Sequence, residues 1–182
     1  MSKKIIILNG SPRPNGATAS LIKAFTEGAE QSGHIVTTFL LDSMNINGCK
    51  GCFGGGKDPG SPCVQKDEME KIYPVYKEAD IVVMASPLYY WNLSGQLRTA
   101  FDRLFAVAEC EKNYKNPIKD CILLMAAEGN GFAETINYYE NLMKHLNWNS
   151  LGTVLIGGLD ESGNTEGRQE LQDARTLGEF IG

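Results

Sequence analysis

The sequence alternates five apolar runs with five segments of helical periodicity, and this alternation restricts the fold more than any other feature. The first run is continuous and β-branched, as expected of a strand that is buried on both faces. The predicted strands are Lys4–Asn9, Ile35–Leu41, Ile81–Ser86, Cys121–Ala127 and Leu151–Gly157. The predicted helices are Thr18–Ser32, Asp67–Glu78, Ser94–Ala108, Gly131–Asn147 and Thr165–Phe180. This order predicts an α/β fold with a five-stranded parallel sheet and helices on both faces.

Length and charge narrow the possible partners. The 182 residues fit a single domain, residues 1–182. The chain has 17 Lys and Arg against 22 Asp and Glu, a net charge of -5, so neither nucleic acid nor an anionic membrane is an expected partner. The N-terminal apolar run is shorter than the roughly 7–15 residues of a signal peptide, and no segment approaches the roughly 18 of a membrane span. We therefore expect a cytoplasmic protein.

The five cysteines indicate free thiols, or a metal or redox role, and argue against a disulfide framework. Their number is odd, and a chain of this size does not need disulfides for stability. They are Cys49, Cys52, Cys63, Cys110 and Cys121. The first three fall in Ser43–Gln65, a long stretch without periodicity that is rich in Gly, Cys and Pro. Stretches of this length in a compact domain are usually functional.

The loop after the first strand has the composition of a phosphate site. It runs from Asn9 to Ser20, with two glycines, several hydroxyl groups and a predicted helix start near Thr18. Free N–H groups and the helix dipole at that point attract a phosphate, and Arg13 adds a positive charge. An ordinary strand-to-helix turn with a Ser or Thr cap is the alternative. The loop matches neither G-x-x-x-x-G-K-[ST] nor G-x-G-x-x-G, so a P-loop or a dinucleotide fingerprint is not supported.

The loop after the third strand carries three consecutive aromatic residues, Tyr89, Tyr90 and Trp91. In a parallel sheet this loop lies at the same edge as the first loop, where ligands bind. Flat side chains suit a flat ligand, because stacked rings gain more than their buried area alone. The alternative is that these rings cover the core or a subunit contact. A phosphate site beside an aromatic loop fits flavin mononucleotide (FMN) at the switch point of the sheet.

Four motifs together resemble the NADPH-dependent FMN reductase family, and its iron–sulfur flavoprotein branch is the most similar. The motifs are Gly10-Ser-Pro-Arg-Pro-Asn-Gly16, Cys49-Lys-Gly-Cys52, Ser86-Pro-Leu-Tyr-Tyr-Trp91, and Ser94-Gly-Gln-Leu-Arg98 followed by Phe101-Asp-Arg103. They span about the first 105 residues in register. The resemblance implies a flavodoxin-like three-layer sandwich with the strand order 2-1-3-4-5 and FMN as a non-covalent cofactor.

The resemblance also implies a set of cofactor contacts. The residues that would hold the FMN phosphate are Ser11, Arg13, Asn15, Thr18 and Ala19. The residues that would line the isoalloxazine are Pro87, Leu88, Tyr89, Tyr90, Trp91 and Asn92. The loop Ala127-Glu128-Gly129 would approach the other side of the ring.

Two positions depart from the family pattern. Relatives often carry Asn where this chain has Ala17, which removes one contact from the phosphate loop. Iron–sulfur members carry C-x2-C-x2-C and a further Cys, whereas the third position here is Gly55. We therefore expect no metal ligands in this chain, although Cys49, Cys52 and Cys63 leave open a single ion such as zinc.

The expected activity is reduction of a small acceptor (a free flavin, a quinone, an azo compound or a metal ion) by NAD(P)H. No catalytic side chain is expected, because the flavin itself carries the hydride chemistry. A flavin electron carrier without enzymatic activity is the alternative, and a redox or metal sensor that uses Cys49 and Cys52 is a third hypothesis. We also expect a homodimer or homotetramer with the aromatic loop at a subunit contact.

Overall fold

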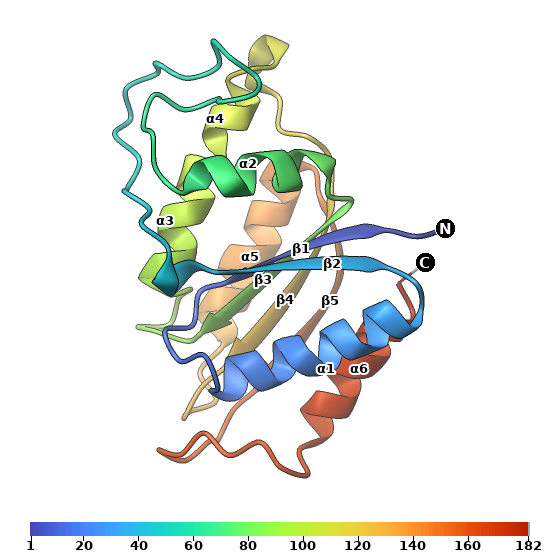
Figure 1. The fold of residues 1–182 in the computed structure, drawn as a ribbon. Coiled ribbons are helices and arrows are strands. Elements are labelled where there is room, and N and C mark those ends of the chain that lie inside the picture. The colour runs from blue at the N-terminus through green and yellow to red at the C-terminus, as the bar shows by residue number, and fades with distance from the viewer. Residues whose placement is uncertain (182) are drawn as a thin grey trace.

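The computed structural model describes residues 1–181 and has five strands and six α-helices in alternation (Figure 1). The strands are β1 (Lys4–Asn9), β2 (Ile35–Leu40), β3 (Ile81–Pro87), β4 (Asp120–Ala126) and β5 (Asn149–Ile156). The helices are α1 (Ala17–Gln31), α2 (Met69–Glu78), α3 (Gly95–Arg103), α4 (Phe105–Ala108), α5 (Ala133–Leu146) and α6 (Gln169–Glu179). Short 3₁₀ turns lie at Leu41–Ser43 and Lys112–Tyr114.

The sheet is entirely parallel, with the order β2-β1-β3-β4-β5, so the predicted flavodoxin-like topology is confirmed. Strand β1 pairs with β2 on one side and with β3 on the other, for example Ile7 with Val83. The chain therefore reverses its direction of winding between β1 and β3. At such a switch point the loops that leave the two strands separate and open a crevice.

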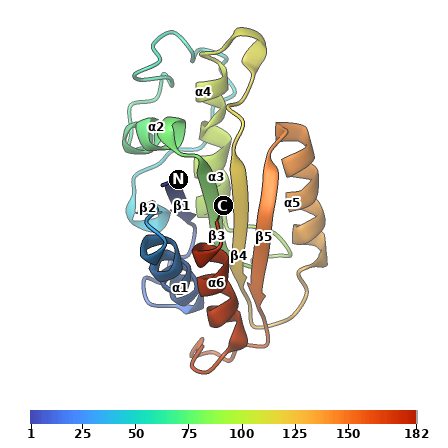
Figure 2. The same cartoon turned by 90° about the vertical axis from the view of Figure 1, so that its right-hand side faces the viewer.

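Helices cover both faces of the sheet, as predicted (Figures 1 and 2). Side chains of a strand alternate between the two faces. In β1, Ile5 and Ile7 pack toward α1 and α6, whereas Ile6 and Leu8 pack toward α2, α3 and α5. All four are at most 1% exposed, so β1 is buried on both sides. This burial explains why the run is apolar throughout.

One predicted helix is divided in the structure. The segment predicted as Ser94–Ala108 forms α3 and a separate short helix α4, with a break at Leu104. The apolar periodicity continues across Leu104, so the sequence pattern alone did not reveal the break. Phe105 is consequently 39% exposed, and its ring stacks on Tyr114 with the centroids 6.1 Å apart.

Asp67, the first residue of the predicted helix Asp67–Glu78, has a structural role beyond the start of that helix. It accepts a hydrogen bond from the Met69 N–H at the start of α2, but its main partner is Arg103. The two Arg103–Asp67 hydrogen bonds are 2.6 and 3.1 Å long, and both side chains are nearly inaccessible to solvent. Burial alone would raise the pKa of Asp67, but the hydrogen bonds from Arg103 and from backbone N–H groups outweigh it and hold that pKa below its ordinary value.

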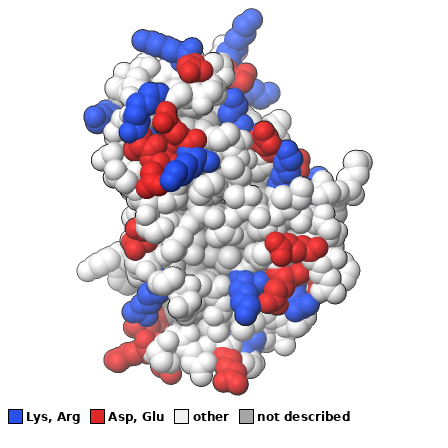
Figure 3. Space-filling model, viewed as in Figure 1, with Lys and Arg blue, Asp and Glu red and all other residues white. Residues whose placement is uncertain are grey.

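The face seen in Figure 3 carries Lys and Arg interspersed with Asp and Glu. Its middle is uncharged, and charges of both signs gather above and below. A surface for nucleic acid would instead concentrate positive charge. Among residues 1–181, no helix is long and apolar enough to cross a membrane.

Candidate functional site

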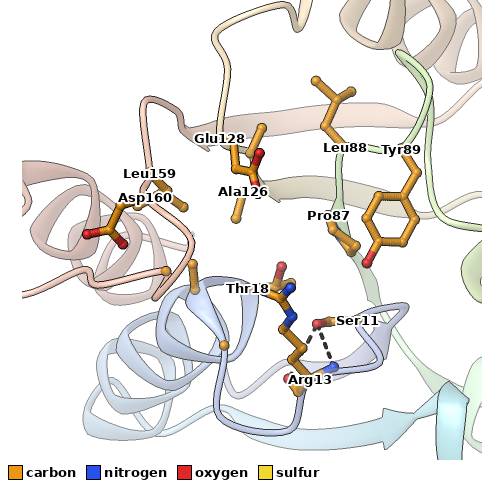
Figure 4. Close-up of a pocket in the computed structure, with 14 residues that line it drawn as sticks. Ser11, Arg13, Thr18, Pro87, Leu88, Tyr89, Ala126, Glu128, Leu159 and Asp160 are labelled. Carbon is orange, nitrogen blue, oxygen red and sulfur yellow. Dashed lines mark hydrogen bonds between the residues drawn. The ribbon is translucent and has the colours of Figure 1, made fainter.

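The candidate site is a cavity of about 260 Å³ at the carboxyl ends of β1, β3 and β4, beside the start of α1 (Figure 4). Four separate loops supply its walls, as expected at a switch point. The lining residues are Ser11, Arg13, Gly16, Ala17, Thr18, Pro87, Leu88, Tyr89, Ala126, Ala127, Glu128, Leu159, Asp160 and Gly163.

The start of α1 forms the polar end of this cavity. The N-cap is Gly16, which has no side chain to accept from the first N–H groups, and no acidic residue lies in the first turn. The first N–H groups of a helix have no partner within the helix, so those of this turn are available to a ligand. They coincide with the positive end of the helix dipole, and therefore favour an anion.

Ser11, Arg13 and Thr18 surround this helix start. The Arg13 N–H donates to Ser11 Oγ over 3.2 Å, and this contact shapes the loop between β1 and α1. In Figure 4 the Arg13 side chain extends toward Thr18. Thr18 is only 2% exposed although it is polar, and it lines the cavity. A buried hydroxyl beside free N–H groups suits a ligand with several acceptor oxygens.

Ser94 joins the loop after β1 to the loop after β3. It is fully buried, its Oγ donates to the Gly10 carbonyl over 2.8 Å, and its N–H donates to Ser86 Oγ over 2.8 Å. The same hydroxyl caps α3 by accepting from the Leu97 N–H. Gly10 is in such close contact with this group that a Cβ would overlap Ser94 Oγ and lie 2.7 Å from Leu97 Cβ. The two loops can approach this closely because Gly10 has no side chain.

The aromatic loop is a tight two-residue turn. Tyr89 and Asn92 exchange two backbone hydrogen bonds of 3.0 Å, so that Tyr90 and Trp91 occupy the central positions. Both central residues have positive φ, 47° and 56°, which is costly for side chains of this size. Thr135 Oγ1 holds the turn by donating to the Trp91 carbonyl over 2.7 Å. The Tyr90 ring is left 95% exposed, beside the cavity that Tyr89 lines.

The loops after β4 and β5 complete the cavity. Ala126 and Leu159 contribute apolar surface, and the Leu88 N–H donates to the Ala126 carbonyl over 2.9 Å, which ties the two walls together. The Asp160 carboxylate accepts hydrogen bonds from groups within its own loop. Hydrogen bonds from the Ser162 hydroxyl and from neighbouring backbone N–H groups lower the pKa of Asp160. In Figure 4 the Asp160 carboxylate lies at the edge of the lining residues, away from Arg13.

Of the residues that the sequence analysis names as FMN contacts, the structure places about half in the lining of the cavity. Those that line the cavity are Ser11, Arg13, Thr18, Pro87, Leu88, Tyr89 and Glu128. Those outside the lining are Asn15, Ala19, Tyr90, Trp91, Asn92 and Gly129. The last four are neighbours of lining residues, on the same two loops. Asn15 and Ala19 flank the α1 start, and Asn15 is exposed.

Several lining residues were not named as ligand contacts from the sequence. Leu159, Asp160 and Gly163 follow β5, in a loop rich in glycine and polar residues that the sequence reading did not connect with the ligand site. Gly16 and Ala17 were recognised only as parts of a loop. Their contribution is backbone geometry at the helix start, and side-chain chemistry gives no signal for it.

The cysteine stretch lies apart from this cavity. Cys49, Cys52 and Cys63 line a second cavity of about 130 Å³ against α3 and α4, and Cys49 and Cys52 are exposed. Within residues 1–181, no three His, Cys, Asp or Glu side chains converge as ligands of one metal ion would. Cys121 is buried in β4, as predicted, and burial raises its pKa to about 12.

Residues 3–160 match the family described as NADPH-dependent FMN reductase. The chain belongs to this family. That membership confirms the resemblance found in the four motifs and places the chain among flavin-dependent oxidoreductases.

Its relatives include proteins named iron–sulfur flavoproteins. One from Archaeoglobus fulgidus is 29% identical over 98% of this chain and 78% of its own length. Another, from Methanosarcina thermophila, is 28% identical over 85% of this chain and 77% of its own length. The iron–sulfur flavoprotein branch named from the sequence is thereby supported.

Solved structures agree on the fold. An NAD(P)H:quinone oxidoreductase from Methanothermobacter marburgensis superposes with a TM-score of 0.78, at 19% identity, over 98% of this chain and 96% of that one. An FMN-dependent NADH-azoreductase from Bacillus anthracis, solved in complex with FMN, gives 0.68 at 15% identity over 96% of this chain and 95% of that one. Identities this low establish the shared fold and nothing finer.

The contact at Gly10 generates a prediction for this member of the FMN reductase family. Gly10→Ala should lower the free energy of unfolding by about 1–3 kcal/mol, because the added methyl overlaps Ser94 and Leu97 in a packed site. Urea denaturation measures this change. Gly95→Ala is the matched control, since a Cβ there meets no atom and Ala favours a helix. Equal stability of the two variants would contradict the proposed close contact.

Proposed function

We propose that this chain binds FMN in the cavity between β1, β3 and β4 and reduces a small acceptor at the expense of NAD(P)H. The observation that carries the proposal is the uncapped start of α1, which opens onto an apolar cavity in a chain of the FMN reductase family. The proposed donor is the nicotinamide that the family description names. The acceptor class remains that of the sequence analysis: a flavin, a quinone, an azo compound or a metal ion.

The residues present fit the phosphate end of FMN. The helix start offers N–H donors without competition from a carboxylate, and Ser11, Arg13 and Thr18 surround it. Hydrogen bonds to a charged group are stronger than neutral ones, so these donors suit a dianionic phosphate. Asn15 and Ala19, which flank the same turn, are the remaining residues proposed for this end.

The apolar part of the cavity fits a flat ring. Pro87, Leu88 and Tyr89 form one wall, with Ala126 and Ala127 on the neighbouring strand and loop. The turn residues Tyr90, Trp91 and Asn92 would extend this wall beyond the cavity. The loop that contains Glu128 and Gly129 would approach the other face of the ring. When bound, FMN would supply the two-electron hydride chemistry that links the nicotinamide to the acceptor. The protein's role is to orient the ring and to limit access of water.

A flavin electron carrier is the second candidate function. It is favoured by the relatives named iron–sulfur flavoproteins, and it requires no nicotinamide site. The two candidates differ in whether the purified protein alone oxidises NAD(P)H.

The first test of the function is a direct one. The purified protein should be yellow, and mass spectrometry of the released cofactor should identify FMN, because the cavity offers a site for one phosphate and the sequence lacks a dinucleotide fingerprint. With a quinone present, absorbance at 340 nm should show sustained NAD(P)H oxidation. FMN without this turnover would favour the electron carrier. Release of FAD, or a protein that takes up no FMN, would contradict the proposal itself.

A second test concerns the phosphate end. Thr18→Val removes the buried hydroxyl while keeping its volume, and one hydrogen bond to a charged group contributes about 1.5–3 kcal/mol. We therefore expect FMN to bind roughly ten- to hundredfold more weakly, as measured by quenching of flavin fluorescence. Riboflavin lacks the phosphate and should bind both proteins alike.

Ser20→Ala is the matched control for Thr18→Val. Ser20 lies on the same helix but outside the cavity, where its hydroxyl donates to the Gly16 carbonyl over 3.4 Å. Its loss should leave FMN binding unchanged. Equal losses of FMN and riboflavin in Thr18→Val would show that the phosphate lies elsewhere.

A homodimer or homotetramer is part of the same proposal. Tyr90 and Trp91 are 95% and 58% exposed beside the proposed flavin site, and monomers rarely display adjacent large aromatics. Sedimentation at micromolar concentration should therefore give a dimer or a larger species, and Tyr90→Ser with Trp91→Ser should shift it toward monomer. A monomer that retains FMN would contradict this part of the proposal and leave the flavin site intact.

A further inference from the structure

Residues 49–64 form a closed lobe, which we call the cysteine lobe. It lies beside α4, at the end of the molecule opposite to α1 and α6 (Figures 1 and 2). Its two ends are joined by backbone and side-chain contacts: Asn45 N–H to Glu68 Oε2, Glu68 N–H to the Asn45 carbonyl, and Gln65 Nε2 to the Gly48 carbonyl. The lobe is therefore closed at its base by these three hydrogen bonds.

The base of the lobe rests on the buried Arg103–Asp67 pair. Arg103 Nη1 donates both to Asp67 and to the Asn47 carbonyl, and the Asn47 N–H donates to Asp67 over 3.0 Å. Arg103 is 1% exposed, yet its Nε has no hydrogen-bond partner among the described residues. Arg103 also lines the cavity that the three cysteines share.

The three thiols occupy different positions around this cavity. Cys49 and Cys52 are exposed, whereas Cys63 is half-buried and contacts the Tyr73 hydroxyl. Cys110 also lies on this side of the molecule and is half-buried, but it does not line the cavity. Cys49 and Cys52 are therefore distinct from the rest, as two exposed thiols that are three residues apart in the chain.

The lobe does not fit the cluster after which the relatives are named. A [4Fe–4S] cluster takes four cysteine thiolates, and this cavity is lined by three. No side chain fits at position 55, because a Cβ on Gly55 would overlap Glu109 Oε2 and lie 2.8 Å from the Pro62 carbonyl. Gly56 is equally constrained, because its φ is +75° and a Cβ there would overlap the Glu109 carbonyl. Both glycines therefore pack against the end of α4 with no room for a side chain.

The segment from Cys49 to Cys52 instead suits a pair of thiols that react with each other. Gly51 adopts φ 58°, in the left-handed region that favours glycine. Its N–H donates to Cys49 Sγ over 3.4 Å, so the Cys49 sulfur lies over the backbone that leads to Cys52. The C-x-x-C spacing brings two sulfurs within reach of one disulfide, and exposure gives small disulfides access to them.

We propose that the cysteine lobe is a thiol–disulfide exchange site, at which Cys49 and Cys52 form a disulfide by reducing a low-molecular-weight disulfide, and that it holds no iron–sulfur cluster. The Cys49 thiolate attacks one sulfur of the small disulfide and releases the first thiolate. Cys52 then attacks Cys49 Sγ, which forms the intramolecular bond and releases the second thiolate. Two electrons and the two thiol protons pass to the small molecule, which leaves as two thiols.

The sequence permits a sharp test, because Lys50, Lys57 and Lys66 let trypsin place each of the three cysteines on a separate peptide. The full-length protein is equilibrated without oxygen in mixtures of oxidised and reduced glutathione, alkylated and digested. Under oxidising mixtures we expect the peptide ending at Lys50 to be joined to peptide 51–57 in most chains, with the link lost on reduction. Mass spectrometry identifies the pair.

Variants and a metal assay complete the test. In Cys52→Ser the second step is blocked, so Cys49 should retain one glutathione, whereas Cys63→Ser and Cys110→Ser should keep the 49–52 link. Protein purified without oxygen should contain less than about one iron atom per chain and no acid-labile sulfide. A link to peptide 58–66, no link in any mixture, or stoichiometric iron with sulfide that Cys49→Ser abolishes would each overturn the proposal. The assays use no flavin chemistry, so they are independent of the proposed reductase activity.

Discussion

The hydrogen bond from Ser94 to the Gly10 carbonyl is the contact on which the candidate site depends. It joins the loops that leave β1 and β3, two strands that are adjacent in the sheet but more than seventy residues apart in the chain. Ser94 is at the same time the cap of α3 and a partner of Ser86, so one buried hydroxyl fixes two loops and a helix. Because Gly10 has no side chain, this contact can be short, and the crevice at the switch point has a fixed width.

The cavity combines two environments that rarely lie so close together. The start of α1 offers free N–H groups and a dipole that attract an anion, while Pro87, Leu88 and Ala126 contribute apolar surface to the neighbouring wall. A ligand with a charged end and a flat apolar body meets both requirements. The positive φ values of Tyr90 and Trp91 indicate strain held at this site, and such strain is found where function requires a particular loop shape.

The cysteine lobe depends on a different interaction. A buried, bidentate ion pair between Arg103 and Asp67 fastens the base of the lobe to α3. Breaking one half of such a pair leaves an uncompensated buried charge, and typically costs about 3–5 kcal/mol. The candidate cavity and the lobe are thus supported by separate contacts, so one can change in a member of this family without the other. Glycines at 55 and 56 in a chain related to iron–sulfur flavoproteins fit that independence.

The sequence by itself determined the fold class, the five strands along the chain, and the two loops that carry the candidate site. These follow from local pattern: apolar runs such as Ile5–Leu8 must be buried on both faces, and glycines with hydroxyls at a helix start expose N–H groups. The residues of the β5 loop, the break at Leu104 and the partner of Asp67 were decided only by tertiary structure. Leu159 and Asp160 reach the cavity because β5 lies beside β4, and Arg103 meets Asp67 because α3 packs beside the loop before α2. Contacts between segments distant in sequence leave no periodic pattern in either one, and packing alone selects them.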